Sequence, residues 1–307
     1  MDYEIRPYRH EQDFERVGQF LAAQYRGGDN PLLWIQPRWE YMHYHPLIKD
    51  TDISKIGVAE VDGQIAGVVH HEHDEGVIYF QVPPEYDYLK RPLFDYAEAT
   101  FGSKDENGRE RLLIFINEAD LTLQRLAVER GYEENVEFRE VTSRYDVSRG
   151  VPQAALPEGF RLQSLAEEND LRKINQVLWR GFNHEGPAPE EGIQERDDMQ
   201  EAPNFMHDLT IVAVAPNGDY VSFCGMWVVP QNGISYVEPV ATDPDYRRMG
   251  LGAAVVLEGI RRTIPAGAKV AWVGSEQEFY MAIGFEQSYR ATAWIKYGDQ
   301  QAVISGQ

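Results

Sequence analysis

One stretch of the chain decides the fold: Asp243-Pro244-Asp245-Tyr246-Arg247-Arg248-Met249-Gly250-Leu251-Gly252-Ala253-Ala254. Residues 233–241 before it are predicted to form a strand, and the apolar positions from Val255 to Ile260 after it predict a helix. Gly250 and Gly252 stand where that helix begins. The start of a helix offers unpaired backbone N–H groups and the positive end of the helix dipole, and a residue without Cβ lets phosphate oxygens come close. The stretch therefore predicts a phosphate-binding loop.

Three kinds of phosphate site compete for this loop. A P-loop requires Gly-Lys-Ser/Thr, and the chain has Gly252-Ala253-Ala254 instead. A dinucleotide-binding fingerprint would need a third glycine where Val255 stands, and the antiparallel hairpins predicted upstream argue against its βαβ context. The third interpretation is a site for the pyrophosphate of an acyl-coenzyme A. Arg247 and Arg248 add positive charge here, in a chain whose net charge is −21.

The two halves of the chain repeat one order of elements. Each is predicted to run strand, helix, hairpin, strand, helix, strand, helix and closing strand. The hairpins turn at Asp62-Gly63 and Asn217-Gly218, which supply the positive φ angles of tight turns. We expect a domain over residues 1–147, a linker over 148–158 and a second domain over 159–307, with the closing strands at about 137–145 and 287–297.

Two motifs in the second half resemble those of a known family. Arg247-x-x-Gly250-x-Gly252, followed by Phe279-Tyr280-x-x-x-Gly284-Phe285, is similar to the motif pair of the GCN5-related N-acetyltransferases (GNAT). The resemblance covers about residues 159–297. It implies an α+β fold of two tandem GNAT-like domains, each a mixed, mostly antiparallel sheet flanked by helices. It also implies acetyl-CoA as the acyl donor, lying between two strands that splay apart.

The resemblance assigns candidate site residues. Tyr280 matches the tyrosine that protonates the departing thiolate, and Glu238 matches a glutamate that many relatives use as a base. His184 and Glu185 are rival bases, and a solvated carboxylate remains the plain alternative for Glu238. The implied coenzyme contacts are Val240, Ala241, Thr242, Arg247, Arg248, Met249, Gly250, Leu251, Gly252, Ala253 and Ser275. Ser275 departs from the pattern, because many relatives have an asparagine there.

The acceptor pocket is expected to involve Trp179, Phe182 and His184, although packed core aromatics are an equal alternative. Residues 186–204 look irregular and are expected to form a loop or lid. Pro239, which cannot donate a ladder hydrogen bond, is compatible with a bulge or break in its strand.

The first half departs from the family pattern. Lys90 and Pro92 occupy the two glycine positions, and Ala127 stands in place of the tyrosine. We expect this half to be a degenerate, non-catalytic copy that caps the acceptor side of the second half or braces its sheet. His71 and His73 would share one face of a strand, but no metal site is expected.

Composition limits the remaining possibilities. The excess of 50 acidic over 29 basic side chains favours solubility or attraction of cationic substrates, and it does not favour nucleic acid. Cys224 is the single cysteine, which fits a reducing cytoplasm, and neither a signal peptide nor an apolar run of about 20 residues is visible.

These observations predict a cytoplasmic, acetyl-CoA-dependent N-acetyltransferase that acts on a small cationic amine, without a metal or a membrane partner. The alternatives are acetylation of a protein or peptide amine, and a non-catalytic regulatory protein that binds coenzyme A.

Overall fold

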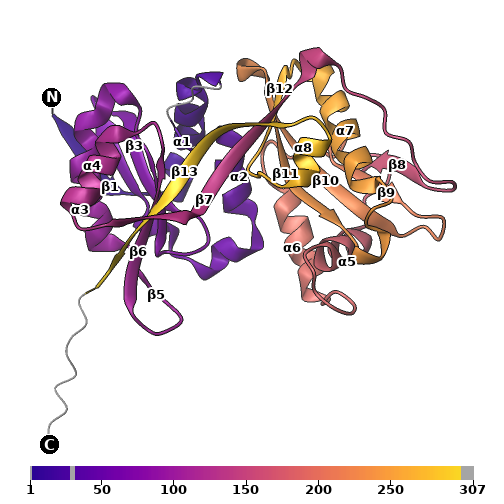
Figure 1. Ribbon diagram of the computed structural model, residues 1–307, viewed down its shortest axis with the longest axis horizontal. Coiled ribbons are helices and arrows are strands. Elements are labelled where there is room, and N and C mark those ends of the chain that lie inside the picture. The colour runs from indigo at the N-terminus through magenta and orange to yellow at the C-terminus, as the bar shows by residue number, and fades with distance from the viewer. Residues whose placement is uncertain (1, 28–31, 299–307) are drawn as a thin grey trace, which may run out of the picture. The chain divides into compact units, whose positions relative to one another are not determined.

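The computed structural model describes residues 2–27 and 32–298. Residue 1 and residues 299–307, the outer ends of the two expected domains, lie outside the described residues. The chain divides into two compact units (Figure 1), which are treated separately below. The first contains Met1–Ile35, Leu47–Glu140 and Tyr289–Gln307, and the second contains Gln36–Pro46 and Val141–Ser288.

The first unit is a sheet with helices packed on it. Its strands follow the order β1 (Tyr3–Pro7), β2 (Gly57–Val61), β3 (Gln64–His71), β4 (Val77–Gln81), β6 (Glu110–Asn117) and β13 (Glu286–Tyr297), with the short β5 (Ser103–Lys104) also on β6. Its helices are α1 (His10–Gln24), α3 (Lys90–Thr100) and α4 (Leu121–Glu129). β4 and β6 run parallel, and the other neighbours are antiparallel.

The second unit has the same plan. Its strands follow the order β7 (Glu133–Asp146), β12 (Val270–Val273), β11 (Ile234–Thr242), β10 (Tyr220–Val229), β9 (Ile211–Val214) and β8 (Arg161–Ser164). Its helices are α2 (Gln36–Tyr44), α5 (Leu171–Gly181), α6 (Glu191–Gln200), α7 (Leu251–Thr263) and α8 (Glu278–Ala282). Only β11 and β12 run parallel, so the predicted mixed, mostly antiparallel α+β architecture is confirmed in both units.

The closing strands are exchanged between the two halves of the sequence. β7, from the first half, pairs with β12 through Ser143–Asp146 in the second unit. β13, from the second half, pairs with β6 through Ala291–Tyr297 in the first unit. The compact units therefore differ from the expected division into 1–147 and 159–307, although both strands form at the expected residues.

Two helices were not predicted. Residues 186–204 were expected to be irregular, but α6 forms there and contacts α5 and α2. The aromatic stretch before residue 45 forms α2, which buries Trp39, Tyr41 and Met42. α2 belongs to the second unit and contacts α6, β10 and β11, so part of the first half of the sequence does cover the second unit's sheet.

The histidine cluster does not have the arrangement expected of a strand face. β3 ends at His71, so His73 lies beyond the strand. His70 and His71 are both fully buried. His70 Nδ1 lies 2.9 Å from the carbonyl oxygen of His71, and its Nε2 lies 3.0 Å from Gln81 Nε2. Both ring nitrogens are therefore engaged in hydrogen bonds with neighbouring residues.

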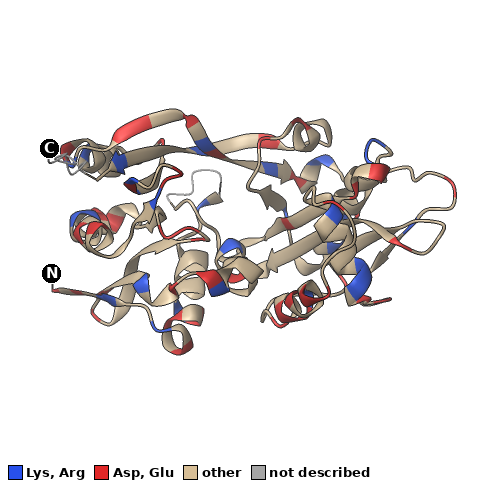
Figure 2. Cartoon of the chain, turned by 90° about the horizontal axis from the view of Figure 1, so that it is seen from below, with Lys and Arg blue, Asp and Glu red and all other residues tan. Residues whose placement is uncertain are grey.

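Charge and hydrophobicity follow the composition. Figure 2 shows Asp and Glu interspersed with Lys and Arg along the chain. Within the described ranges, no helix has the length and apolar character required to cross a membrane. Cys224 is fully buried on β10, and burial raises the pKa of its thiol.

Candidate active site

The site lies where β11 and β12 separate. The two strands pair in parallel only over Ile234–Tyr236 and Val270–Trp272, while β11 continues to Thr242. On its other side β11 stays paired with β10 as far as Thr242. The segment 237–242 therefore has β10 on one edge only, which is the splay that the resemblance implied.

The predicted irregularity at Pro239 is confirmed. The register between β10 and β11 shifts between Cys224 and Met226, opposite Val237 and Val240. Gly225 on β10 lies opposite the two bulged residues of β11, Glu238 and Pro239, and a Cβ on it would lie 2.3 Å from the carbonyl oxygen of Glu238. Bulges are common next to functional sites, and Glu238 is one of the two residues in this one.

The glycine loop begins α7 as the sequence predicted. Gly250 has a φ of 81°, a left-handed conformation that favours glycine, and α7 begins at Leu251 directly after it. No side chain of the described residues caps this helix start. The first-turn N–H groups are therefore left for another acceptor, and a phosphate oxygen suits them in charge and geometry.

Gly252 serves close packing. A Cβ at this position would lie 3.1 Å from Thr242 Oγ1 and 3.4 Å from the ring of Phe279. The Thr242 hydroxyl is itself held 2.8 Å from Ser222 Oγ, so it has little room to move. A side chain on Gly252 would thus close the space between β11, α7 and α8.

Arg247 holds this loop to the end of α5. Its guanidinium donates to the carbonyl oxygens of Thr242 (3.1 Å) and Gly181 (2.9 Å) and to Asn183 Oδ1 (2.8 Å). The neighbouring Arg248 has a φ of 64° and an exposed side chain. Arg247 therefore links the loop to the end of α5, and Arg248 adds a second exposed cation beside it.

A cavity of about 660 Å³ joins these elements. Of the residues expected to contact the coenzyme, those that line it are Val240, Ala241, Thr242, Arg247, Arg248, Gly250, Leu251, Gly252 and Ala253. Tyr280 and Phe182 line it as well. Its other lining residues are Gly181, Asn183, Tyr246, Gln277, Phe279, Ala282 and Ile283. The glycine loop, the splayed strand and the family tyrosine thus meet in one space.

Tyr280 is the middle residue of α8 and is only 7% exposed. Burial raises the pKa of its phenol well above the usual value, and the Cys224 thiol and the Glu238 carboxylate raise it further. The phenol is therefore protonated at neutral pH, as a hydrogen-bond donor must be.

Glu238 is fixed at both its backbone and its side chain. Its carbonyl accepts from Trp227 Nε1 at 2.9 Å, and its Oε2 accepts from the Tyr236 hydroxyl at 3.0 Å. The carboxylate is half-buried, and it is close enough to Tyr280 to affect the pKa of that phenol. Glu238 itself lies outside the set of residues that line the 660 Å³ cavity.

Five other predicted residues, among them the rival base Glu185, also lie outside that set of lining residues. Trp179 and His184 stack on each other, with ring centroids 4.0 Å apart, and the Trp179 indole donates to the carbonyl of Glu185. Met249 is 37% exposed at the tip of the loop. Ser275 supports a turn instead.

The Ser275 turn leads into α8. The Ser275 carbonyl accepts from the Ser143 hydroxyl of β7 at 2.6 Å, and its Oγ accepts from Gln277 N at 3.2 Å. Gln277 precedes the first residue of α8 and lines the cavity, but it was not predicted. Its position directly before the predicted last helix was the available signal.

The corresponding place in the first unit is occupied by a lysine. Lys90 begins α3, is 4% exposed, and pairs through Nζ with Asp87 (2.6 Å) and Asp120 (2.8 Å). Ala127, the counterpart of Tyr280, is fully buried. The helix start that binds phosphate in the family pattern thus carries an internal ion pair here.

Metal ligation has no support among the described residues. Within 2–27 and 32–298, no three or more His, Cys, Asp or Glu side chains gather in a way that would hold a metal ion.

Comparisons with known proteins agree with this geometry. Residues 171–285 match the model of the Acetyltransferase (GNAT) family. An uncharacterized N-acetyltransferase from Methanocaldococcus jannaschii is 28% identical over 91 residues, which are 26% of this chain and 40% of that protein. The chain thus spans less than half the length of this relative.

Solved structures extend the likeness to the whole chain. A GCN5-related N-acetyltransferase from Sphaerobacter thermophilus superposes with a TM-score of 0.62 at 14% identity, covering 96% of this chain and 95% of that one. A tandem GNAT protein from the clavulanic acid biosynthesis pathway gives a TM-score of 0.61 at 12% identity, covering 97% and 100%. The chain therefore has the tandem GNAT fold, and residues 171–285 in its second half match the acetyltransferase model of the GNAT family.

Proposed function

We propose that the protein is an N-acetyltransferase that transfers the acetyl group of acetyl-CoA to a small cationic amine, in its second unit. The observation that carries this proposal is the cavity in which the uncapped start of α7, the open edge of β11 and Tyr280 meet. The family domain at 171–285 supports acyl transfer as the class of reaction.

The chain's own residues fit the coenzyme. The N–H groups at residues 251–253 suit a pyrophosphate, and Gly252 keeps the approach to it open. The open edge of β11 at Val240–Thr242 offers backbone groups to the amide-bearing arm, as a sheet edge does to an added strand. Backbone N–H groups in the same segment are candidates to stabilise the oxyanion of the thioester carbonyl.

The reaction forms a bond from the amine nitrogen to the acetyl carbon and breaks the carbon–sulfur bond. The amine must be neutral to attack, and we assign Glu238 as the base that accepts its proton, directly or through water. Tyr280 donates a hydrogen bond to the departing sulfur. Because burial raises the pKa of the phenol above that of an ordinary thiol, partial donation to the developing charge is favoured over complete proton transfer.

The first unit has a supporting role in this proposal. The buried Lys90 ion pair occupies the start of α3, so we infer that this unit binds no acetyl-CoA. Residues of the first half contribute to the second unit through α2 and through Ser143, whose hydroxyl holds the Ser275 turn.

An acetyl-CoA turnover assay across a panel of amines and peptides tests the function. Release of free thiol that depends on a small amine, with an N-acetylated product, is the expected result. Turnover on peptides alone would favour protein acetylation, and tight binding of acetyl-CoA with no acceptor-dependent thiol release would favour the regulatory alternative.

A further inference from the structure

The helix that carries Tyr280 is too short to hold its own position. α8 has only five residues, and an isolated helix of that length is not stable in water. The backbone of Tyr280 is bonded to the segments on either side. Its N–H donates to the carbonyl of Gln277 at 2.9 Å, and its carbonyl accepts from the N–H of Phe285 at 3.0 Å. The contacts that hold Gln277 and Phe285 therefore set the place of the phenol.

Two side chains of β7 lie on the side of the sheet that α8 covers. Ser143 and Tyr145 are two residues apart, so they share one face of the strand. Both are buried, while Arg144 between them is exposed. They pair with Val273 and Ala271 of β12, the strand that precedes α8. All of these residues belong to the second unit, so β7 presents a hydroxyl and an aromatic ring next to the segment that carries Tyr280.

Ser143 holds the segment before α8. Its hydroxyl donates to the Ser275 carbonyl at 2.6 Å, and Ser275 Oγ accepts from Gln277 N at 3.2 Å. Because the Gln277 carbonyl accepts from Tyr280 N, these hydrogen bonds connect Ser143 to the backbone of Tyr280. Ser143 is fully buried, so water does not compete for its hydroxyl.

Tyr145 holds the segment after α8. Its ring meets that of Phe285 edge to face, with centroids 5.5 Å apart, and Phe285 meets Tyr280 in the same way at 5.5 Å. A Cβ on Gly284 would lie 2.9 Å from the Tyr145 ring, so the backbone passes directly against this ring. The Tyr145 hydroxyl donates to the carbonyl of Gly150 at 2.7 Å, which fixes the ring in turn. Three rings therefore pack in series from β7 to the phenol.

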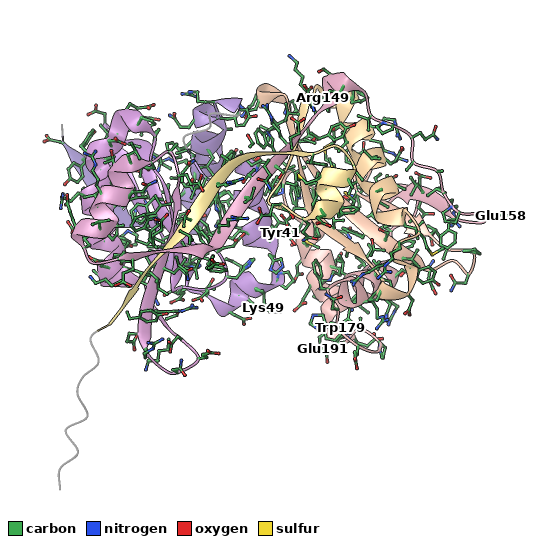
Figure 3. All side chains as sticks on the ribbon, viewed as in Figure 1. Tyr41, Lys49, Arg149, Glu158, Trp179 and Glu191 are labelled. Carbon is green, nitrogen blue, oxygen red and sulfur yellow. The ribbon has the colours of Figure 1, made fainter. Side chains whose placement is uncertain are left out.

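The residues that follow β7 contact the same region more weakly. Figure 3 labels Arg149, whose guanidinium pairs with Glu286, the residue after Phe285. Both side chains of this pair are more than half exposed, and exposed ion pairs contribute little. The buried Ser143 and Tyr145 are therefore the stronger restraints on α8.

The first unit provides a comparison without the tyrosine. In the ladder registers, Thr292 of β13 takes the position that Ser143 takes on β7, and the buried Trp294 follows two residues later. The helix beside them carries the buried Ala127 in place of Tyr280. The Thr292 hydroxyl forms no hydrogen bond with any residue within 2–27 and 32–298. The hydroxyl link thus occurs in the unit that has a tyrosine to place.

We propose that Ser143 and Tyr145 are positioning residues for Tyr280, supplied to the second unit by a strand from the first half of the sequence. This inference rests on the proposed acetyl transfer and adds the residues that hold its hydrogen-bond donor in place. A misplacement of about 1 Å at a reacting group lowers a rate by as much as about 100-fold. One contact before α8 and one after it restrict the helix from sliding or tilting away from the cavity.

A double-mutant cycle measured by steady-state kinetics on the full chain tests this assignment. Ser143→Ala is expected to lower kcat by about 3- to 10-fold, while the Kd for acetyl-CoA stays within about twofold. In the Tyr280→Phe background the same replacement is expected to have no further effect on kcat, because no phenol is left to position. Tyr145→Leu is expected to show the same pattern. Ser143→Ala, which removes a single oxygen, decides the question if Tyr145→Leu does not fold.

Ser235→Ala is the matched control. Ser235 is a fully buried serine on β11, and its Oγ accepts from Thr263 Oγ1 of α7 at 3.4 Å instead of contacting the Ser275 turn. Its kcat is expected to match that of the wild-type protein. A fluorotyrosine placed at position 280 gives a readout besides activity. Its ¹⁹F resonance is expected to shift in Ser143→Ala and to stay in place in Ser235→Ala.

The outcomes separate the two proposals. Unchanged kcat in Ser143→Ala, or an equal loss with and without the Tyr280 hydroxyl, would overturn the positioning role and leave acetyl transfer standing. Absence of turnover on every amine and peptide would overturn acetyl transfer itself. In that case the ¹⁹F resonance decides whether β7 places Tyr280. A shift in Ser143→Ala that Ser235→Ala lacks supports the placement, and an unchanged resonance refutes it.

Discussion

Replacement of Gly250 by alanine separates the conformation of the coenzyme loop from its packing. The nearest atom to a Cβ at this position is 4.0 Å away, so there is room for a methyl group. The φ of 81° is the obstacle, because a left-handed conformation costs an L-residue roughly 1–2 kcal/mol. The loop either retains this strain or relaxes and turns the N–H groups that begin α7 away from the cavity.

Relaxation of the loop has a calculable effect on the coenzyme. One lost hydrogen bond to a charged acceptor is worth about 1.5–3 kcal/mol. We therefore expect Gly250→Ala to weaken acetyl-CoA binding by about 10- to 150-fold, measured by isothermal titration calorimetry.

The control is Gly218→Ala, in the turn between β9 and β10. Gly218 has a φ of 91° with nothing within 4 Å, so it carries comparable strain away from the cavity. Both variants are expected to melt at a lower temperature, and only Gly250→Ala to lose affinity. Wild-type affinity in Gly250→Ala, or an equal loss in Gly218→Ala, would refute the role of the loop.

Four further predictions concern named side chains. Tyr280→Phe should lower kcat by about 10- to 100-fold while the Kd for acetyl-CoA stays within about twofold, and equal losses in both would argue against a role at the leaving group. Lys90→Met should destabilise the protein by about 3 kcal/mol in urea titrations, because Asp120 is left without its buried cation. The variant should still bind one acetyl-CoA per chain. A second bound coenzyme would contradict our account of the first unit. Glu40→Gln should lower the free energy of unfolding by about 1–3 kcal/mol, because the buried Glu40 carboxylate accepts hydrogen bonds from the backbone N–H and the side-chain amide of Asn204, at 2.6 and 2.7 Å. Unchanged stability would show that this link is unimportant. Stability should fall as pH rises above 10, since the unfolded chain releases the Tyr280 proton there while the folded chain retains it; Tyr280→Phe should make the slope shallower by about 1.4 kcal/mol per pH unit.

The sequence predicted most of the elements and the glycine-containing start of α7, because each rests on local chemistry. Each of these signals depends on residues that are only a few positions apart: the alternation of apolar residues in strands, the Asp-Gly and Asn-Gly turns, and the Gly-x-Gly helix start. The loop at Gly250 and Gly252 and the irregularity at Pro239 were accordingly found where the sequence indicated.

The exchange of the closing strands was not predicted, because nothing local specifies a strand's partner. β7 and β13 are copies at equivalent positions, and each presents a similar ladder edge. Either pairing preserves the inward and outward alternation, so the pattern of residues 137–145 and 287–297 is compatible with both.

The unpredicted helices have a different physical cause. The polar stretch 186–204 contains too few apolar residues to form an amphipathic stripe, and α6 buries only Gly192 and Met199. α2 has Trp39, Tyr41 and Met42 at spacings that do not fall on one helical face. Both helices depend on packing against each other and on neighbouring elements, which sequence periodicity does not report.

The central claim is most directly tested by acetyl-CoA turnover with the full chain, with free thiol and N-acetylated product followed together. We predict that thiol release depends on a small amine, matches the amount of product, and falls in Gly250→Ala when acetyl-CoA is subsaturating. Stoichiometric binding of acetyl-CoA, without thiol release in the presence of any amine or peptide, would contradict the account.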